Sequence, residues 1–281
     1  MTATIASAQP ATHSGNPPSP IASTPSSRLK SIKLAGPAGR LEALLNEGAP
    51  NAPFSALVCH PHPLGGGTMH NKVVYHAMKV LNDPQFGLGL PVLRFNFRGT
   101  GLSQGVHDGK AETADVQAAL DWLENEYNLP IVAAGFSFGA AMTLRACCAR
   151  GNTRTNIRAL AALGLPTRAN SHDYHYPCLS ECIIPKLFLS GDQDQFAPAA
   201  QLAQVVASAS DPKRLLFIPG ADHFFHSQLD TMQHALAGWL QDQIKDQVRD
   251  QVRDQIKDQI KDQLKDQVRD QIKDQVKEQP L

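Results

Sequence analysis

Charge of one sign, cysteine and long apolar runs are all scarce in this sequence of 281 residues. The 26 basic and 26 acidic residues cancel, which argues against the basic surface expected for binding nucleic acid or an anionic membrane. No run of ~18 apolar residues occurs, so no transmembrane helix is predicted. Five cysteines do not suggest a disulfide framework, and we expect reduced thiols in a cytoplasmic protein.

The two ends of the chain differ in composition from its middle. Hydrophobic residues make up 42% of the chain, which is enough to bury a sizeable core. Residues 1–27 contain no Lys, Arg, Asp or Glu, so they lack the basic start of a signal peptide and the arginines of a transit peptide. We expect residues 1–27 to form a disordered arm and residues 28–240 to form one folded domain.

The C-terminal segment, residues 241–281, is dominated by a repeat. From Asp242 to Lys277 the chain repeats Asp-Gln-(Ile/Val/Leu)-(Lys/Arg). An apolar residue every fourth position drifts around a helix by roughly 40° per repeat, because a turn holds 3.6 residues. This spacing fits a coiled-coil seam poorly. We predict a tail that is partly helical or disordered, with self-association through the repeat as the functional alternative.

The middle of the chain alternates strand-like and helix-like segments. Unbroken apolar runs of strand length suggest strands buried on both faces, as in a parallel sheet. The pattern predicts an α/β fold with a mostly parallel central sheet, helices on both faces and an active site at the carboxyl ends of the strands. The expected strands are 29–34, 41–46, 54–59, 92–97, 131–136, 160–165, 186–190 and 215–219, and the expected helices are 69–81, 112–127, 138–149, 199–207 and 225–240.

One predicted strand ends in the sequence Gly-Phe-Ser-Phe-Gly, residues 135–139. Small residues on both sides of Ser137 permit a sharp strand-to-helix turn that exposes the serine hydroxyl. The N-terminus of the following helix favours negative charge developing nearby. Ser137 is therefore the candidate nucleophile, and Phe136 and Phe138 either line the site or pack in the core.

Two later strand ends carry an acidic loop and a histidine. Asp192 and Asp194 follow the strand 186–190, and His223 follows the strand 215–219. The order Ser…Asp…His is that of an α/β-hydrolase triad, in which the histidine takes the serine proton and an aspartate orients the histidine. Both aspartates remain candidates on this reasoning. Asp222 is expected to cap a turn, and His226 to pack or face solvent in the next helix.

The loop after the strand 54–59 reads Cys-His-Pro-His-Pro-Leu-Gly-Gly-Gly-Thr-Met. In this fold such a loop supplies one N–H of the oxyanion hole, and the residue after the nucleophile, Phe138, supplies the other. Pro61 and Pro63 have no N–H, which leaves His62 and Leu64 as candidate donors. We expect His60 to brace the loop through hydrogen bonds.

The same loop raises two other interpretations, a phosphate site and a metal site. Three consecutive glycines can cradle a phosphate, but no G-x-x-x-x-G-K-(S/T) motif occurs in the chain. His60, His62 and His70 have no acidic or cysteine companion in a known ligand spacing. The sequence therefore predicts neither a cofactor nor a metal.

Several of these motifs, in this order, resemble the α/β-hydrolase superfamily, and in particular small lid-less bacterial serine esterases and dienelactone-hydrolase-like enzymes. The resemblance implies Ser137 as nucleophile, His223 as base and Asp194, rather than Asp192, as the acid. It also implies little or no cap, consistent with the short stretch 166–185 between two core strands. The matching stretches are 59–64, 66–74, 93–101, 135–140 and 220–225.

The resemblance leads us to expect a carboxylic ester hydrolase that forms an acyl-enzyme on a small-molecule ester. Acyl transfer to another acceptor and amide cleavage are alternatives on the same fold. A catalytically idle hydrolase-fold scaffold is an alternative of a different class. Because fold alone does not name a substrate, the acyl and alcohol groups stay open at this stage.

Overall fold

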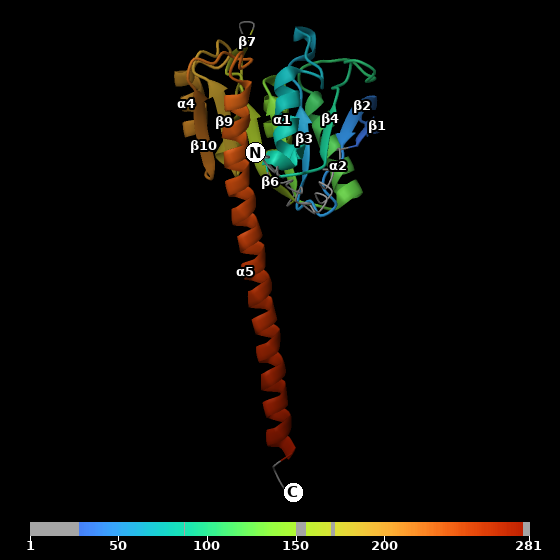
Figure 1. Ribbon diagram of the computed structural model, residues 1–281, viewed down its shortest axis with the longest axis vertical. Coiled ribbons are helices and arrows are strands. Elements are labelled where there is room, and N and C mark those ends of the chain that lie inside the picture. The colour runs from blue at the N-terminus through green and yellow to red at the C-terminus, as the bar shows by residue number, and fades with distance from the viewer. Residues whose placement is uncertain (1–27, 87, 150–155, 170–171, 278–281) are drawn as a thin grey trace, which may run out of the picture.

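An eight-stranded sheet forms the centre of the computed structural model, with the strand order β1-β2-β4-β3-β5-β6-β9-β10 (Figure 1). The structure describes residues 28–86, 88–149, 156–169 and 172–277. The predicted N-terminal arm, residues 1–27, lies outside the described residues. The strands are β1 (Leu29–Gly36), β2 (Gly39–Asn46), β3 (Ser55–Cys59), β4 (Val92–Phe95), β5 (Ile131–Phe136), β6 (Ile157–Leu163), β9 (Lys186–Gly191) and β10 (Lys213–Ile218).

The sheet is parallel except at one edge. β1 and β2 form an antiparallel hairpin, and β2 pairs antiparallel with β4. From β4 through β3, β5, β6 and β9 to β10, every pair is parallel. All residues of β3, β4, β5 and β9 are buried, as expected for strands covered on both faces. The predicted fold class is confirmed.

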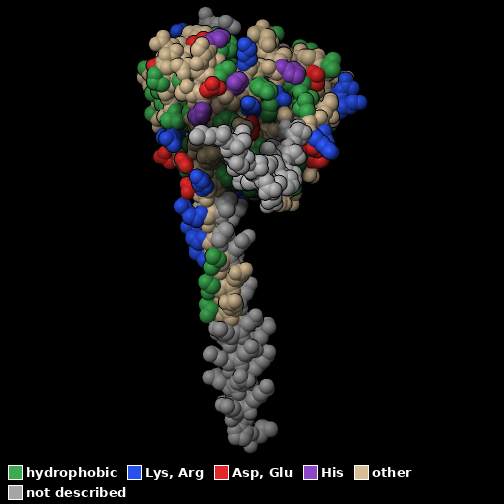
Figure 2. All heavy atoms as spheres, in the orientation of Figure 1, with side chains coloured by type: hydrophobic (Ala, Val, Ile, Leu, Met, Phe, Trp, Pro, Cys, Tyr) green, Lys and Arg blue, Asp and Glu red, His purple; other side chains and the backbone are tan. Residues whose placement is uncertain are grey.

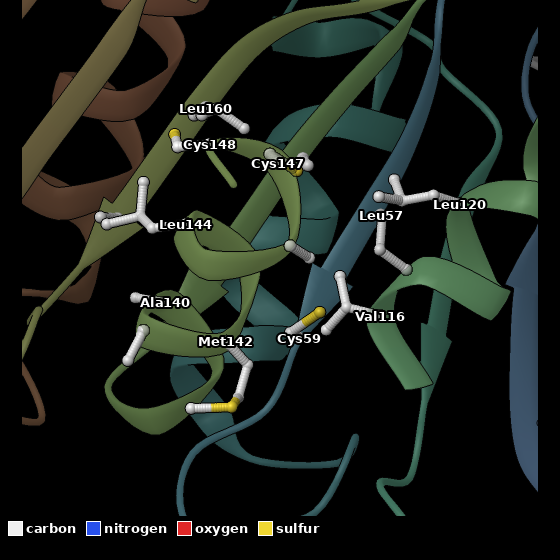
Figure 3. Packing of buried hydrophobic residues seen from close by; sticks show 14 of the residues in the cluster. Leu57, Cys59, Val116, Leu120, Ala140, Met142, Leu144, Cys147, Cys148 and Leu160 are labelled. Carbon is white, nitrogen blue, oxygen red and sulfur yellow. The ribbon is translucent and has the colours of Figure 1, made fainter. Parts of the chain in front are cut away.

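Helices cover both faces of the sheet. Residues of α2, α3 and α4 belong to one apolar cluster, and residues of α1 and the first part of α5 belong to a second. Figure 3 shows the first cluster, where Val116 and Leu120 of α2 lie close to Leu57 and Cys59 of β3. The helices are α1 (Lys72–Asn82), α2 (Glu112–Tyr127), α3 (Phe138–Cys147), α4 (Ala199–Ala207) and α5 (Leu229–Lys277).

Two predicted helix starts are corrected by local backbone chemistry. α1 begins at Lys72 rather than at residue 69, because the Asn71 side chain accepts the N–H of Val73 and so caps the helix there. α5 begins at Leu229 rather than at residue 225, because Phe225 and Ser227 have positive φ angles that interrupt a helix. His226 therefore lies before α5 and not inside it.

Short elements fill the stretch between β6 and β9. They are a two-stranded hairpin, β7 (Arg168–Ala169) with β8 (His172–Asp173), and a 3-10 turn, η3 (Pro177–Ser180). Three residues of the stretch line the cavity described below, and its described residues form no α-helix.

The helix α5 packs on the sheet at its start and then projects from the domain (Figure 1). Met232, Leu236 and Leu240 are buried in the second cluster, whereas Ile256 and Ile260 are about half exposed. The part predicted as a partly helical or disordered tail thus continues a domain helix as far as Lys277. Figure 2 shows basic and apolar side chains exposed along it. Self-association through this tail stays a prediction.

The expectation that all five cysteines are reduced is wrong in this structure. Cys148, just after α3, and Cys182, just before β9, form a disulfide. The two residues are separated by 34 positions, and only the packing of η3 against α3 brings them together, so their spacing gave no signal. Cys59 and Cys147, which are buried, and Cys178, which is partly buried, are not part of a disulfide. The cytoplasmic location stays a prediction.

The length and hydropathy of the helices show whether any of them could span a membrane. In the described ranges, every helix is too short or too polar to cross a membrane.

Candidate active site

Ser137 occupies a strained turn between β5 and α3. Its φ of 55° and ψ of −119° lie outside the regions that most residues with a side chain adopt. The turn needs glycine on both sides: a Cβ at Gly135 would collide with the Gly139 carbonyl oxygen, and one at Gly139 would lie 2.5 Å from the Cys59 carbonyl oxygen. The serine therefore sits on a tight strand-to-helix turn, directly before the first residue of α3.

Three side chains from three strand ends meet at this turn. The Nε2 atom of His223 lies 2.9 Å from the Ser137 Oγ, and its Nδ1 atom lies 2.8 Å from Asp194 Oδ2. The Asp194 side chain is fully buried and the His223 side chain is 3% exposed. The structure thus brings together the serine, histidine and aspartate that the sequence predicts.

Asp194 is fixed by further hydrogen bonds. Its Oδ2 accepts the Ser190 hydroxyl at 3.0 Å, and its Oδ1 accepts the N–H groups of Phe196 and Ala197. Asp192, the other sequence candidate, instead accepts the N–H of Gly220 at 2.7 Å. The geometry thus distinguishes two acidic residues that the sequence motif alone left equivalent.

Aromatic rings enclose the His223 imidazole. Its centroid lies 4.6 Å from that of Phe196, 5.0 Å from that of Phe136 and 5.1 Å from that of Phe224. A Cβ at Gly164 would lie 3.2 Å from the His223 Cε1 atom. These contacts fix the ring plane and leave the Nε2 edge directed at the serine. Phe136 is fully buried, whereas Phe138 is buried and also lines the cavity.

His60 braces the loop that follows β3, as the sequence analysis expects. Its Nδ1 donates to the Pro61 carbonyl at 2.7 Å, and its Nε2 accepts the N–H of Phe97 at 3.0 Å. Burial lowers the pKa of His60 to about 4, so the ring is neutral near pH 7 and serves as a structural link between two loops.

The predicted oxyanion-hole donors differ in their hydrogen bonding. The Leu64 N–H donates to the Nδ1 atom of His62 at 3.2 Å. The His62 N–H has no hydrogen-bond acceptor among the residues that the structure describes. Phe138 is the first residue of α3, where backbone N–H groups have no partner within the helix. Of the two loop candidates, His62 is therefore the one whose N–H is available to a ligand.

A second histidine–carboxylate pair lies beside Phe138, and no sequence pattern predicted it. His107 Nδ1 lies 2.7 Å from Glu112 Oε1, and the side chains are 8% and 0% exposed. The His107 ring contacts the rings of His62 and Phe138, with centroids 4.7 and 5.4 Å away. Burial, and then the neighbouring His107, lower the pKa of His62. No motif signals this pair, because it depends on how the loop before α2 folds back.

An exposed histidine pair lies near the site. Asp222 accepts the N–H groups of Phe224 and His226, so it caps the turn as predicted. His226 Nδ1 lies 2.6 Å from Asp222 Oδ2, with the His226 side chain 75% exposed. His226 faces solvent and does not reach Ser137.

These groups open into a cavity of about 470 Å³. Its floor includes Ser137, Phe138 and His223, and the glycines of the loop 65–67 form one wall. Pro166, Ala169 and Tyr174, from the stretch between β6 and β9, line it as well. In the described part of the chain, no cluster of His, Cys, Asp and Glu is suited to hold a metal ion.

Comparison with known proteins gives consistent matches. The family described as "Alpha/beta hydrolase domain" matches residues 56–250. An uncharacterized protein of Rickettsia prowazekii is 38% identical over 224 residues, which cover 75% of this chain and 89% of that protein.

Two solved structures add to these matches. An alpha-beta serine hydrolase homologue from Coxiella burnetii is 33% identical, with coverage of 75% of this chain and 97% of that one and a TM-score of 0.66. A serine hydrolase without lid from Xanthomonas campestris is 32% identical, with coverage of 74% and 91% and a TM-score of 0.62.

Proposed function

The chain belongs to the α/β-hydrolase domain family, and from this premise we propose that it is a serine hydrolase that cleaves carboxylic esters through an acyl-enzyme. One observation carries the proposal: an unbroken chain of contacts joins the Ser137 hydroxyl to His223, at 2.9 Å, and His223 to buried Asp194, at 2.8 Å. A catalytically idle scaffold would have no need to hold these three side chains in line.

In the first half of the reaction, Ser137 Oγ attacks the ester carbonyl carbon while His223 Nε2 takes the hydroxyl proton. Asp194 accepts the Nδ1–H of His223, which keeps Nε2 free to act as the base and stabilises the imidazolium that forms. The negative charge then rests on the former carbonyl oxygen. The N–H groups of Phe138 and His62 are the proposed donors to that oxygen.

Collapse of the tetrahedral intermediate breaks the bond to the alkoxide, and His223 Nε2 gives its proton to the departing oxygen. The acyl group stays on Ser137 Oγ. A water molecule then repeats the sequence with His223 as its base, which releases the carboxylic acid and restores the serine. The open cavity supports this second half, because water can reach the site through its mouth.

The test is the intact mass of the protein after treatment with a fluorophosphonate, which reacts only with an activated serine. We expect one adduct on the natural chain and none on Ser137→Ala. We also expect para-nitrophenyl acetate to be hydrolysed by the natural chain and not by the variant above the uncatalysed rate. A folded natural chain that takes no adduct would overturn the proposal.

A further inference from the structure

The lining of the cavity is uncharged. Among the described residues that line it, none is Lys, Arg, Asp or Glu. Arg168 precedes the lining residue Ala169, but its guanidinium pairs with Asp173 at 3.3 Å and is largely exposed. A carboxylate or phosphate on a substrate would therefore lose its water in this cavity and meet no cation, which is costly.

Two aromatic residues of the lining also contact the proposed base. The Phe196 and Phe224 rings both line the cavity and both pack edge-on against His223. Phe196 is fixed through its own N–H, which donates to Asp194. Phe224 is 40% exposed at the mouth. The part of the cavity wall beside His223 is therefore aromatic. It lies next to the proposed triad and not next to the glycine loop, residues 65–67.

The chemistry of ester cleavage identifies which half of the substrate meets that wall. When Ser137 Oγ forms its bond to the carbonyl carbon, the bond from that carbon to the alcohol oxygen must break. The leaving oxygen takes its proton from His223 Nε2, so it must come within hydrogen-bond reach of that atom. The alcohol half of the ester consequently lies next to His223, between Phe196 and Phe224.

We propose that the substrate is an uncharged ester with an aromatic or similarly flat apolar alcohol half, and that Phe196 and Phe224 are the residues that recognise this half. The inference rests on the proposed function. Aromatic rings favour edge-to-face and offset contacts with a flat apolar group, and such contacts add to the gain from burying its surface. An anionic alcohol half is rejected, because no cation replaces its water.

A matched pair of esters tests the charge preference. Methyl para-acetoxybenzoate is neutral and para-acetoxybenzoate is anionic, but both leave the same acetyl group on Ser137, so deacylation is identical. We compare kcat/KM for the two after dividing each by the rate of its alkaline hydrolysis. We expect the neutral ester to be preferred at least ~10-fold. Equal corrected values would overturn the charge preference.

A charged substitution tests the location of the alcohol half. Phe224→Lys places an ammonium at the mouth beside His223, and its partial exposure makes the change tolerable for folding. We expect the anionic-to-neutral ratio to rise ~10-fold. Ile183→Lys is the matched control: Ile183 is 77% exposed and precedes the N-terminal end of β9, whereas the site lies at the carboxyl ends of the strands, so its ratio should stay unchanged. An unchanged ratio in Phe224→Lys would overturn the assignment.

The second wall residue is tested without a change of charge. Phe196→Leu keeps an apolar side chain but removes the ring, so the preference for phenyl acetate over methyl acetate should fall ~10-fold while the neutral-to-anionic preference persists. A preserved phenyl preference would exclude Phe196 from recognition. Failure of the proposed function is recognised separately, because it would leave Ser137 without a fluorophosphonate adduct and every ester uncleaved.

Discussion

Two buried histidine–carboxylate pairs differ in what the rest of each imidazole ring contacts: the His223 ring lines the cavity, and the His107 ring packs against two residues that line it. His223 and Asp194 are 2.8 Å apart, and His107 and Glu112 are 2.7 Å apart. The far nitrogen of His223 reaches the Ser137 hydroxyl. The His107 ring instead packs against two other rings, those of His62 and Phe138.

The comparison shows that a buried carboxylate next to a histidine does not by itself determine the role of that histidine. Asp194 accepts the Nδ1–H of His223 and so orients that ring, whereas Glu112 lies close to His107 Nδ1 without forming a hydrogen bond with it. Only His223 has a nucleophile within hydrogen-bond reach, so only this pair is proposed to move a proton in the reaction. The His107 pair holds a ring against His62 and Phe138, the two residues whose N–H groups we propose as oxyanion donors, and its role is positional.

Asp194→Asn should have the largest effect, because it removes the carboxylate from the histidine pair that contacts Ser137. An amide favours the wrong tautomer of His223, so kcat should fall by about three to four orders of magnitude, with the fold retained. The measurement is steady-state hydrolysis of para-nitrophenyl acetate. Asp192→Asn is the matched control, since Asp192 caps the Gly220 N–H, and its kcat should change less than about threefold. Equal losses in both variants would contradict the assignment.

Glu112→Gln removes the carboxylate from the other pair, and it should lower the stability of the fold without lowering the rate of ester hydrolysis. The amide oxygen can still accept the N–H of Asp108, but the charge beside His107 is lost in a fully buried place. We expect the free energy of unfolding to drop by about 1–3 kcal/mol in urea titrations, with kcat within about threefold of the natural value. A loss of kcat as large as that of Asp194→Asn, in a fully folded variant, would mean that this pair takes part in the reaction.

His60 is a third buried histidine, without a carboxylate beside it, and lowering the pH should reveal its contribution to the stability of the fold. Its pKa is about 4 in the fold against 6.5 for the free side chain, so the unfolded chain binds more protons between these values. The contribution of neutral His60 to the free energy of unfolding is complete above pH 6.5 and is lost as the pH falls toward 4. Between pH 7 and pH 5 the expected loss is about 2 kcal/mol. Urea unfolding at both pH values measures this loss of unfolding free energy. In His60→Asn, the loss between pH 7 and pH 5 should be smaller by about 2 kcal/mol than in the natural chain.

His226→Ala should have the smallest effect, because its pair with Asp222 is exposed to water. Surface pairs of this kind contribute about 0–1 kcal/mol, so unfolding and kcat should both stay close to those of the natural chain. Thermal unfolding and ester hydrolysis check this. A large loss of activity would show that this histidine reaches the substrate.

Local signals explain why most of the site was predictable. The turn around Ser137 demands glycine at 135 and 139, and the strand before it must be apolar, so the motif is visible as letters in the sequence. The parallel sheet follows from the fully buried strands, whose residues are apolar on both faces. His60 was predictable as a brace because it sits between a strand end and two prolines.

The remainder depends on contacts between distant segments. Asp192 and Asp194 are both acidic residues in one loop, and the contact with His223, 29 positions away, singles out Asp194. His107 and Glu112 lie five positions apart without a motif, and their pairing needs the fold of the loop before α2. The Cys148–Cys182 disulfide likewise needs η3 to pack against α3.

The direction of α5 has a consequence for how the protein is held in space. The helix starts beyond the carboxyl ends of the strands, where His223 also lies, runs along one face of the sheet and leaves past the opposite ends of the strands (Figure 1). At 1.5 Å per residue, the part beyond Leu240 is about 55 Å long. A chain tethered by its C-terminal tip would therefore stand off from its support by that distance, with the mouth of the cavity turned outward to the surrounding solution.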